Sequence, residues 1–434
     1  MSNIKFNFQF LRSLNKLLKV LWIMILTFGL FYCIISSYLK WQIYPDIAQS
    51  TKLKPASEIP FPAVTICTTA FDYRIQDLTN VQYIAEDFYD HFSIMELTIE
   101  QQNYLQLFYH TCRPELYTDD VITKLLPNRT EKNVLKLLYD VLDPMQYNFC
   151  QFKGIMIRCD LLYSRTFTDY GACETYNWQG HDVVFKQEIV SENYTIFKSN
   201  DISEYPVTNI MLRSKNGKKK QRKRIRNNKI YWSLEDGYLT EKEEVWPVRA
   251  ERKHFVTFNI RWSNDYQVDF CASTGGGFIF MLHLPSEMPT TIHEKYFVGF
   301  NDDKKVMVTA KSYKTRENLR HLNPHKRQCY FPGEKPLKFF KTYTKAHCEY
   351  ECMTNYTLNK CGCVKFSMPH TKVTPICDLE KVYCYYNATQ NWPDRNDEHF
   401  KIPCECYPPC SNIEYSVQSE RTGKSVTFME KDDK

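Results

Sequence analysis

The feature that most constrains this chain is a cluster of cysteines between residues 329 and 410. Ten cysteines lie there: Cys329, Cys348, Cys352, Cys361, Cys363, Cys377, Cys384, Cys404, Cys406 and Cys410. The run around Cys348 contains no Pro or Gly and predicts a helix. On a helix Cys348 and Cys352 share one face, about 6 Å apart along the axis. Cys404 and Cys406 lie between two prolines and predict a short extended piece, where they also share a face, roughly 6.6 Å apart.

The two equal spacings favour two parallel clips between the helix and the extended piece. If the segments run antiparallel, Cys348 pairs with Cys406 and Cys352 with Cys404. Ten cysteines allow on the order of hundreds of pairings, so the geometry expresses a preference only. A zinc site would favour Cys-x-x-Cys pairs in a reducing compartment, whereas this segment has Cys-x-Cys and Cys-x-x-x-Cys. A secreted disulfide module with no further role remains an alternative.

The other bulk features agree with an oxidising compartment. Sixteen of the 17 cysteines follow residue 60, an even number that points to complete pairing. Four Asn-x-Ser/Thr sequons lie in the same part of the chain and predict glycosylation: Asn128, Asn193, Asn355 and Asn387. A net charge of +6 on 434 residues does not favour a nucleic-acid partner.

The N-terminus predicts a membrane anchor. Residues 1–19 carry Lys and Arg but no acid, and residues 20–39 contain no charge, which is the length needed to cross a hydrocarbon core. The basic flank predicts a cytoplasmic N-terminus and an extracellular 40–434. Cys33, within this span, is expected to stay unpaired. A cleaved signal peptide is the alternative, but it would have a shorter apolar run ending at small residues.

Three motifs resemble one family. The series RQC, HCEYEC, KCGC, PIC, YC, CEC and YPPC, the strand IPFPAVTIC at 59–67, and the block from FCQF to GACETYN at 149–177 are similar to degenerin/epithelial sodium channel subunits, closest to the insect pickpocket branch. The resemblance implies an α+β extracellular domain: a β palm and β-ball continuous with 59–67, 255–285 and 305–313, finger helices within about 70–250, and a thumb at about 329–410. Helical spacing of apolar residues at 70–145 agrees with the finger.

The resemblance also implies a disulfide pattern. In the thumb the pairs are Cys329–Cys410, Cys348–Cys406, Cys352–Cys404, Cys361–Cys384 and Cys363–Cys377. Outside it they are Cys67–Cys173 and Cys150–Cys159. Cys112 and Cys271 are left over and pair by elimination.

The function implied by the resemblance is that of a subunit of a trimeric, amiloride-sensitive sodium channel in the plasma membrane, assembled with related subunits around a sodium pore. No second apolar run follows the cysteines; after Cys410 we read only a charged tail. We therefore expect an incomplete chain. The alternative is a single-pass, non-conducting regulatory partner or decoy.

Other patterns predict less. The basic stretch Lys215–Arg226 is read as a solvated loop, with a proteolytic processing site as the alternative. The STGGG run lacks the Lys-Ser/Thr of a phosphate loop and predicts a turn into a buried strand. His293-Glu294 lacks the second His of a zinc protease motif. The chain is therefore not expected to be an enzyme, and no catalytic residue, cofactor or metal site is predicted.

Overall fold

The computed structural model describes most of the chain outside its central third. The described residues are 2–43, 50–68, 147–187 with short gaps, 232–239, 247–250, 256–260, 277–299, 302–390 and 404–424, with a few single positions between 106 and 138 and at 189 and 392. They fall into two compact units. The first unites Met1–Leu53 with Arg316–Cys329, and the second unites Lys54–Thr315 with Tyr330–Lys434. The fold is α+β, as predicted.

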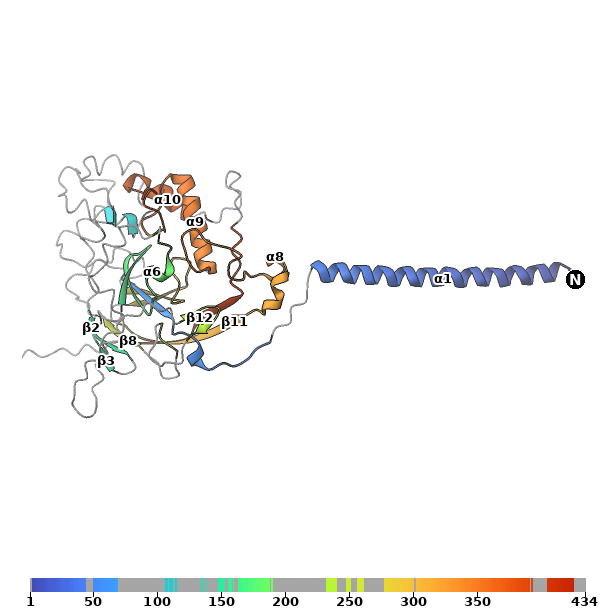
Figure 1. Ribbon diagram of the computed structural model, residues 1–434, viewed down its shortest axis with the longest axis horizontal. Helices are drawn as coiled ribbons and strands as arrows, with labels where there is room; N and C mark the ends of the chain where they lie inside the picture. Colours follow the sequence, from blue (N-terminus) through green and yellow to red (C-terminus); the bar gives the residue numbers. More distant parts are fainter. Residues whose placement is uncertain are drawn as a thin grey trace, which may run out of the picture. The chain divides into compact units, whose positions relative to one another are not determined.

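The first unit contains one long helix, α1 (Ser2–Ile43) (Figure 1). Within it Lys16–Lys40 is long and apolar enough to cross a membrane, with a mean hydropathy of 2.2. The helix starts well before the apolar run because no Pro or Gly interrupts residues 2–28. It ends just before Tyr44-Pro45, a dipeptide that disfavours helical backbone.

The same unit includes two short helical turns, η7 (Glu317–His321) and α8 (Pro324–Arg327). The buried Arg327 side chain organises them, because its guanidinium donates to the carbonyls of Cys329, Arg320 and Leu322.

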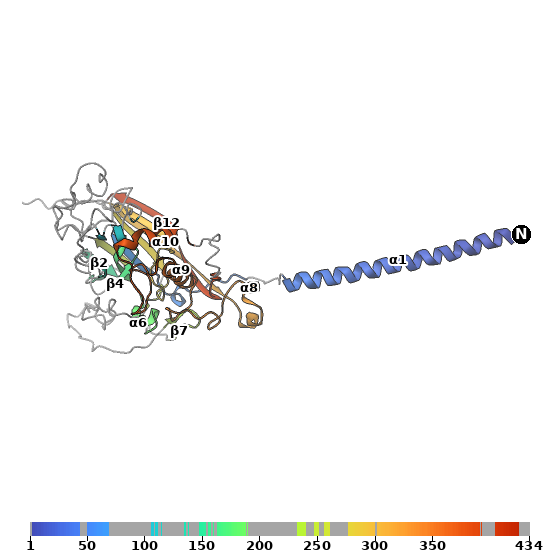
Figure 2. The ribbon, with the colours of Figure 1, turned by 90° about the horizontal axis from the view of Figure 1, so that it is seen from above.

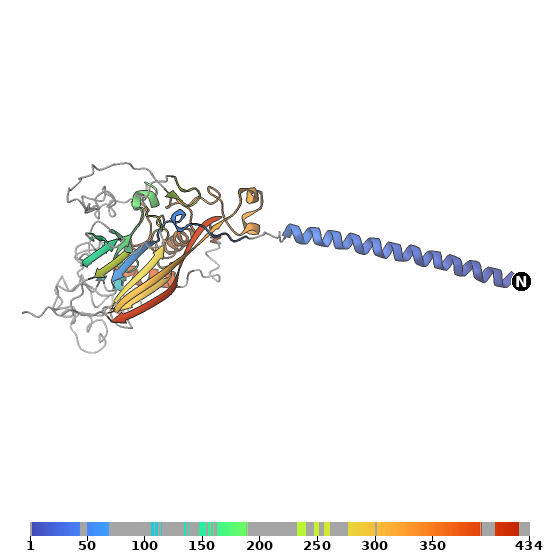
Figure 3. The same cartoon turned by 90° about the horizontal axis from the view of Figure 1, so that it is seen from below.

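A five-stranded antiparallel sheet, called here the main sheet, is the centre of the second unit. Its strands follow the order β10 (Lys295–Gly299), β9 (Gly277–His283), β1 (Ala63–Thr68), β5 (Gly171–Tyr176) and β4 (Tyr163–Thr168). Figure 3 shows β1 in blue beside β9 in yellow. The strand predicted at 59–67 begins at Ala63, directly after Pro62, since a proline cannot donate a hydrogen bond to the sheet.

Three smaller sheets complete the β structure. One has the order β3 (Ile155–Ile157), β2 (Tyr147–Phe152), β8 (Val256–Ile260); one pairs β6 (Trp232–Ser233) with β7 (Gly237–Tyr238); and one is a ribbon of β11 (Asp302–Lys314) and β12 (Ser411–Lys424). The predicted continuous β core over 59–67, 255–285 and 305–313 is therefore split among three sheets. Side chains from all three still share one apolar cluster, which includes Ile66, Phe280, Phe258 and Val306.

The strand β12 is a correction to the sequence analysis, which read only a charged tail after Cys410. Its residues pair with β11 from Lys314↔Ser411 to Asp302↔Lys424. Only its first half alternates apolar and polar residues, with Ile413, Tyr415 and Val417 on one face. The second half, QSERTGK, has no apolar side chain, so the full length of the strand is not evident in the sequence.

The helices of the second unit are α6 (His181–Val184), α9 (Lys345–Cys361) and α10 (Val382–Gln390), with the short turns η1 (Ala56–Glu58) and η8 (Leu379–Lys381). Figure 2 shows α9 and α10 lying together beside the strands. Most of the predicted helical region 70–145 lies outside the described residues. The positions described between 106 and 111 and between 134 and 138 are helical.

Candidate functional site

The helix α9 carries the cysteines from which the sequence analysis started. It begins after Thr344, whose hydroxyl accepts a hydrogen bond from the His347 amide at 3.1 Å. It ends at Gly362, where φ is 73°, a left-handed conformation that favours glycine. These caps set the helix over the run that lacks Pro and Gly.

Two disulfides join α9 to residues 404–406. The Cα atoms of Cys348 and Cys406 are 5.7 Å apart, and those of Cys352 and Cys404 are 6.1 Å apart. Both pairs are those that the spacing favoured. The partner segment is not the extended piece that we predicted: the Cys406 amide donates to the Cys404 carbonyl at 2.9 Å, which closes a tight turn at Glu405. The turn still presents both cysteines to the helix.

Four further disulfides join cysteines that the family resemblance paired. Cys361–Cys384 links α9 to α10, and Cys363–Cys377 closes a short loop after α9. Cys329 and Cys410 are also disulfide-bonded. We call residues 330–410 the clipped segment. Outside it, Cys67–Cys173 joins β1 to β5 and Cys150–Cys159 closes the β2–β3 hairpin. Cys33 is free and exposed on α1.

Several predicted positions lie outside the described residues: Cys112, Cys271, Asn128, Asn193 and the stretch Lys215–Arg226. Of the two remaining sequons, Asn355 lies on α9 and Asn387 on α10, and both are half-buried. Glycosylation at all four positions stays a prediction.

An apolar cluster packs the clipped segment against the residues that follow strands β5 and β9 of the main sheet. Phe340 forms a β-bridge with Phe185, and their rings lie 5.2 Å apart. Buried members of the cluster come from both sides: Trp178, Val184, Phe185, Met288, Phe339, Phe340, Tyr350, Met353, Val364 and Met368. The indole of Trp178 donates to the Glu287 carbonyl at 2.8 Å, so the largest ring of the cluster keeps its polar atom satisfied.

A row of buried, hydrogen-bonded side chains crosses four strands of the main sheet. Thr166 on β4 is 2.9 Å from Thr175 on β5, Thr175 is 2.8 Å from Thr65 on β1, and Thr65 is 2.8 Å from Nε2 of His283 on β9. Nδ1 of His283 donates to the Leu284 carbonyl, so Nε2 accepts and the threonine protons all point the same way. All four side chains are buried.

The row continues into a cluster of ionisable side chains between the main sheet and α9. Glu287 accepts from the Leu284 amide at 3.1 Å and lies 3.4 Å from Nε2 of His293. His347, at the start of α9, accepts at Nε2 from the Met288 amide at 3.0 Å and donates from Nδ1 to the Thr342 carbonyl. A neutral imidazole therefore joins the α9 end of the clipped segment to the loop that follows β9.

Burial keeps the imidazoles of His283 and His347 neutral. Burial lowers the pKa of His283 to about 3 and that of His347 to about 4. Burial alone would raise the pKa of Glu287, but its hydrogen bond with His293 and the neighbouring imidazoles lower it. The two histidines can therefore hold their hydrogen bonds at neutral pH as fixed neutral tautomers.

A second polar contact joins the clipped segment to the turn between β4 and β5. Lys365 and Asp169 form an ion pair at 3.0 Å, with side chains 12% and 10% exposed, and Ser367 donates to Asp169 at 2.7 Å. Burial would raise the pKa of Asp169, but the charge of Lys365 lowers it below its usual value. Beside this pair the Tyr385 hydroxyl lies 3.0 Å from Nδ1 of His110.

The site is thus a packed interface. The disulfide-clipped segment contacts the β core through one apolar cluster and two buried polar contacts. Among the residues that the structure describes, no group of three or more His, Cys, Asp or Glu side chains is placed to hold a metal ion. His293, which precedes Glu294 in the incomplete zinc-protease motif, contacts Glu287. His283, Glu287, His347 and Lys365 were not singled out from the sequence, because single polar residues without a local pattern look like surface residues.

An apolar helix of membrane-spanning length, followed by a disulfide-clipped α+β part, fits a membrane protein. The chain belongs to the amiloride-sensitive sodium channel family, whose model matches residues 4–433. It is 30% identical to pickpocket protein 11 of Drosophila melanogaster over 38% of this chain and 31% of that protein. It is 23% identical to pickpocket protein 28 of the same species over 87% of this chain and 55% of that protein. With the sodium channel protein Nach of D. melanogaster it shares 20% identity over 93% of this chain and 68% of that protein.

The chain spans about half or less of the length of the first relatives that it matches. The family is one of ion channels.

Proposed function

We propose that the chain is a subunit of a trimeric, amiloride-sensitive sodium channel of the plasma membrane, with residues 1–19 in the cytoplasm and the disulfide-rich part outside the cell. The observation that carries the proposal is the family match over nearly the whole chain, from residue 4 to residue 433. It is supported by a helix of membrane-spanning length and by disulfides confined to the part of the chain that follows that helix. Related pickpocket or Nach subunits are the expected partners in the trimer.

In this proposal the clipped segment is the thumb and the β core is the palm. Two clips on α9 and two more around its end make the thumb stiff, so a force at its tip reaches its base with little loss. The polar contacts of His347 and Lys365 then transmit the movement to the main sheet. Within the sheet, the hydrogen-bonded row from Thr166 to His283 connects four strands, so these strands move together.

The strand β1 offers the route to the membrane. It lies at the centre of the main sheet and follows the linker from α1, so a shift of the sheet moves the chain that leads to the membrane helix. Opening by ligand, proton or mechanical force would all use this route.

The test uses the protein encoded by the complete transcript and, separately, the 434-residue chain. Each is expressed with a related subunit in cells, amiloride-sensitive sodium current is recorded, and subunits per complex are counted by stepwise photobleaching of a fluorescent tag. We expect three subunits per complex and an amiloride-sensitive current from the complete product. Three results would contradict the proposal. A tag placed before residue 19 could be labelled from outside intact cells, the complexes could contain a number of subunits other than three, or amiloride could fail to block the current.

The same recordings address the alternative of a decoy. If the complete product carries no current itself and lowers that of its partner, the chain acts as a non-conducting regulator and the channel proposal fails.

A further inference from the structure

A cavity of about 310 Å³ lies at the base of the clipped segment, within the second unit. Its walls come from the linker before β1, the β6–β7 hairpin and the adjoining ends of β11 and β12. Lys314 on β11 pairs with Ser411 on β12, and both line the cavity. The clipped segment ends at Cys410, directly before Ser411, so the cavity adjoins the point at which the chain returns from that segment to the β core.

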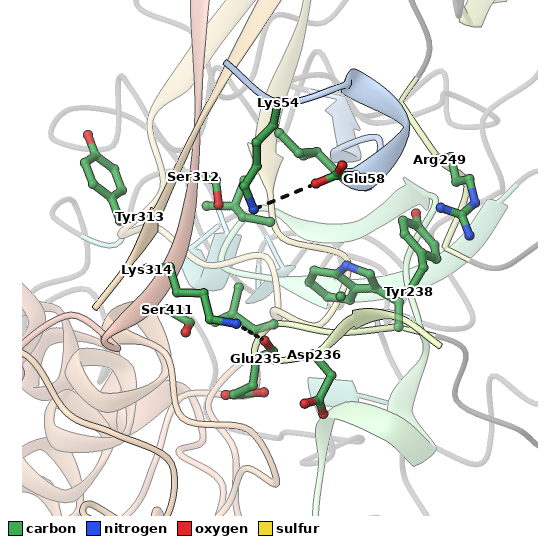
Figure 4. A pocket seen from close by; sticks show the side chains of 15 residues that line it. Lys54, Glu58, Glu235, Asp236, Tyr238, Arg249, Ser312, Tyr313, Lys314 and Ser411 are labelled. Carbon is green, nitrogen blue, oxygen red and sulfur yellow. Dashed lines mark hydrogen bonds and ion pairs between the residues drawn. The ribbon is translucent and has the colours of Figure 1, made fainter. Parts of the chain in front are cut away.

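The polar groups of the cavity are arranged in two opposed sets. Figure 4 shows Lys54 and Glu58 on one side and Lys314 with the Glu235–Asp236 turn on the other. Lys54 and Glu58 lie 3.8 Å apart, and both are about half exposed. The lining has three cationic side chains, which are those of Lys54, Lys314 and Arg249, and three acidic ones, which are those of Glu58, Glu235 and Asp236. The formal charges cancel, so the cavity favours neither an anion nor a cation as a whole.

Individual groups in the cavity nevertheless retain bonding capacity. The Lys314 ammonium donates to the Glu235 carbonyl oxygen at 3.1 Å, which uses one of its three protons. The carboxylate of Glu235 has no hydrogen-bond or ion-pair partner among the described residues. An ammonium with spare donors therefore lies near a carboxylate with spare acceptors. Part of the cavity lining is apolar, formed by buried Trp232, Leu234 and Ile413, which belong to one cluster.

We propose that this cavity binds a small zwitterion of the amino-acid class, with its carboxylate on Lys314, its ammonium on Glu235 and its side chain on the apolar part of the lining. The cavity volume lies at the lower end of the range for small-molecule sites, which suits a ligand of this size. A bound zwitterion would hold the β6–β7 hairpin to the β11 end, and so restrain the base of the clipped segment.

The binding test uses the full chain in detergent and three probes that differ only in charge. L-phenylalanine carries both groups, L-phenylalaninamide lacks the carboxylate, and 3-phenylpropionate lacks the ammonium. By isothermal titration we expect saturable binding of L-phenylalanine and at least about tenfold weaker binding of the other two, since each lacks one charge-assisted hydrogen bond.

Two variants assign the two ends of the ligand. Lys314→Met should bind L-phenylalanine and L-phenylalaninamide equally weakly, because the carboxylate has lost its partner. Glu235→Gln should no longer distinguish L-phenylalanine from 3-phenylpropionate. Lys311→Met is the matched control, since Lys311 lies on the same strand, is exposed and does not line the cavity. Circular dichroism and non-reducing gels establish that each variant is folded.

Three results would overturn the proposal: no saturable binding of L-phenylalanine, equal binding of 3-phenylpropionate to the unchanged chain, or unchanged affinity in both variants. Binding is measured here without current. A failure of this experiment therefore leaves the proposed channel function standing, and a channel experiment that fails leaves the binding site standing.

Discussion

The clipped segment and the main sheet reach a fixed structure by different physical means. Four disulfides connect residues 348–406 of the clipped segment, and its main helix α9 buries polar as well as apolar side chains, among them His347 and Thr357. In the main sheet the described residues form a single disulfide, Cys67–Cys173. There, five strands in continuous register and a core that includes Met281 and Phe280 provide the stability.

The difference teaches where each region is vulnerable. Disulfides stabilise mainly by restricting the unfolded chain, so their loss affects the clipped segment most. The sheet depends on close packing and backbone pairing, so it responds to added volume or a lost hydrogen bond. The polar contacts between the two regions depend on burial and charge.

The largest expected effect comes from mismatching the clips. The clips Cys348–Cys406 and Cys352–Cys404 close loops of 58 and 52 residues, and closing a loop of that length contributes roughly 4 kcal/mol for one bridge. The matched change Cys352→Ser with Cys404→Ser removes one clip and should leave a folded, surface-expressed protein with no new free thiol. The crossed change Cys352→Ser with Cys406→Ser orphans Cys348 and Cys404 and should cause retention inside the cell.

Surface biotinylation and thiol labelling of the denatured proteins measure both outcomes. Equal surface expression together with equal thiol content in the two double variants would show that these four cysteines pair differently.

How far the sequence predicts this molecule depends on the range of the interaction. Local spacing favoured the Cys348–Cys406 clip and the family resemblance implied it. The pairing survived the wrong prediction of an extended piece at 404–406, because a tight turn also brings the cysteines within the roughly 6 Å between Cα atoms that a disulfide spans. Contacts between residues far apart in the sequence leave no pattern in the local sequence from which they could be predicted. Thr65 and His283 are 218 positions apart, and β12 finds its partner β11 about a hundred residues earlier.

The second prediction compares a buried with an exposed ion pair of the clipped segment. Lys365→Met leaves the buried Asp169 without its cation, and breaking such a pair costs about 3–5 kcal/mol. Lys345→Met removes a pair with Glu349 at 3.7 Å in which Lys345 is 56% exposed, so it should cost about 0–1 kcal/mol. Denaturant unfolding of the purified chains gives both free energies. Similar losses would show that the contact at Asp169 does not stabilise the fold.

The third prediction concerns acid. In the unfolded chain a histidine takes up a proton near pH 6.5, whereas burial holds the pKa of His347 at about 4, so the unfolded state binds more protons between these values. The free energy of unfolding should therefore fall as the pH drops from about 6.5 to about 4, by roughly 3 kcal/mol from this residue. Above about pH 7 it should not change through this residue.

A variant separates His347 from the other groups whose pKa is shifted nearby, which include His283 and Glu287. The amide of Gln does not titrate and can accept from the Met288 amide, so His347→Gln should flatten the acid dependence measured by thermal unfolding. An unchanged slope in the variant would exclude His347 as a source of the acid sensitivity.

The smallest effect is expected from Gly277→Ala at the start of β9, next to the edge strand β10 of the main sheet. An added Cβ would collide with the Val298 carbonyl and lie 2.6 Å from the Phe297 ring, so β10 must shift away from β9. Overpacking of this kind costs about 1–3 kcal/mol. Hydrogen exchange should accelerate at β10 amides and stay unchanged in α9, because the clips do not depend on the sheet edge. Gly29→Ala is the control, since no described atom lies within 4 Å of a Cβ there. Faster exchange in α9 as well would mean that the two regions are stabilised jointly.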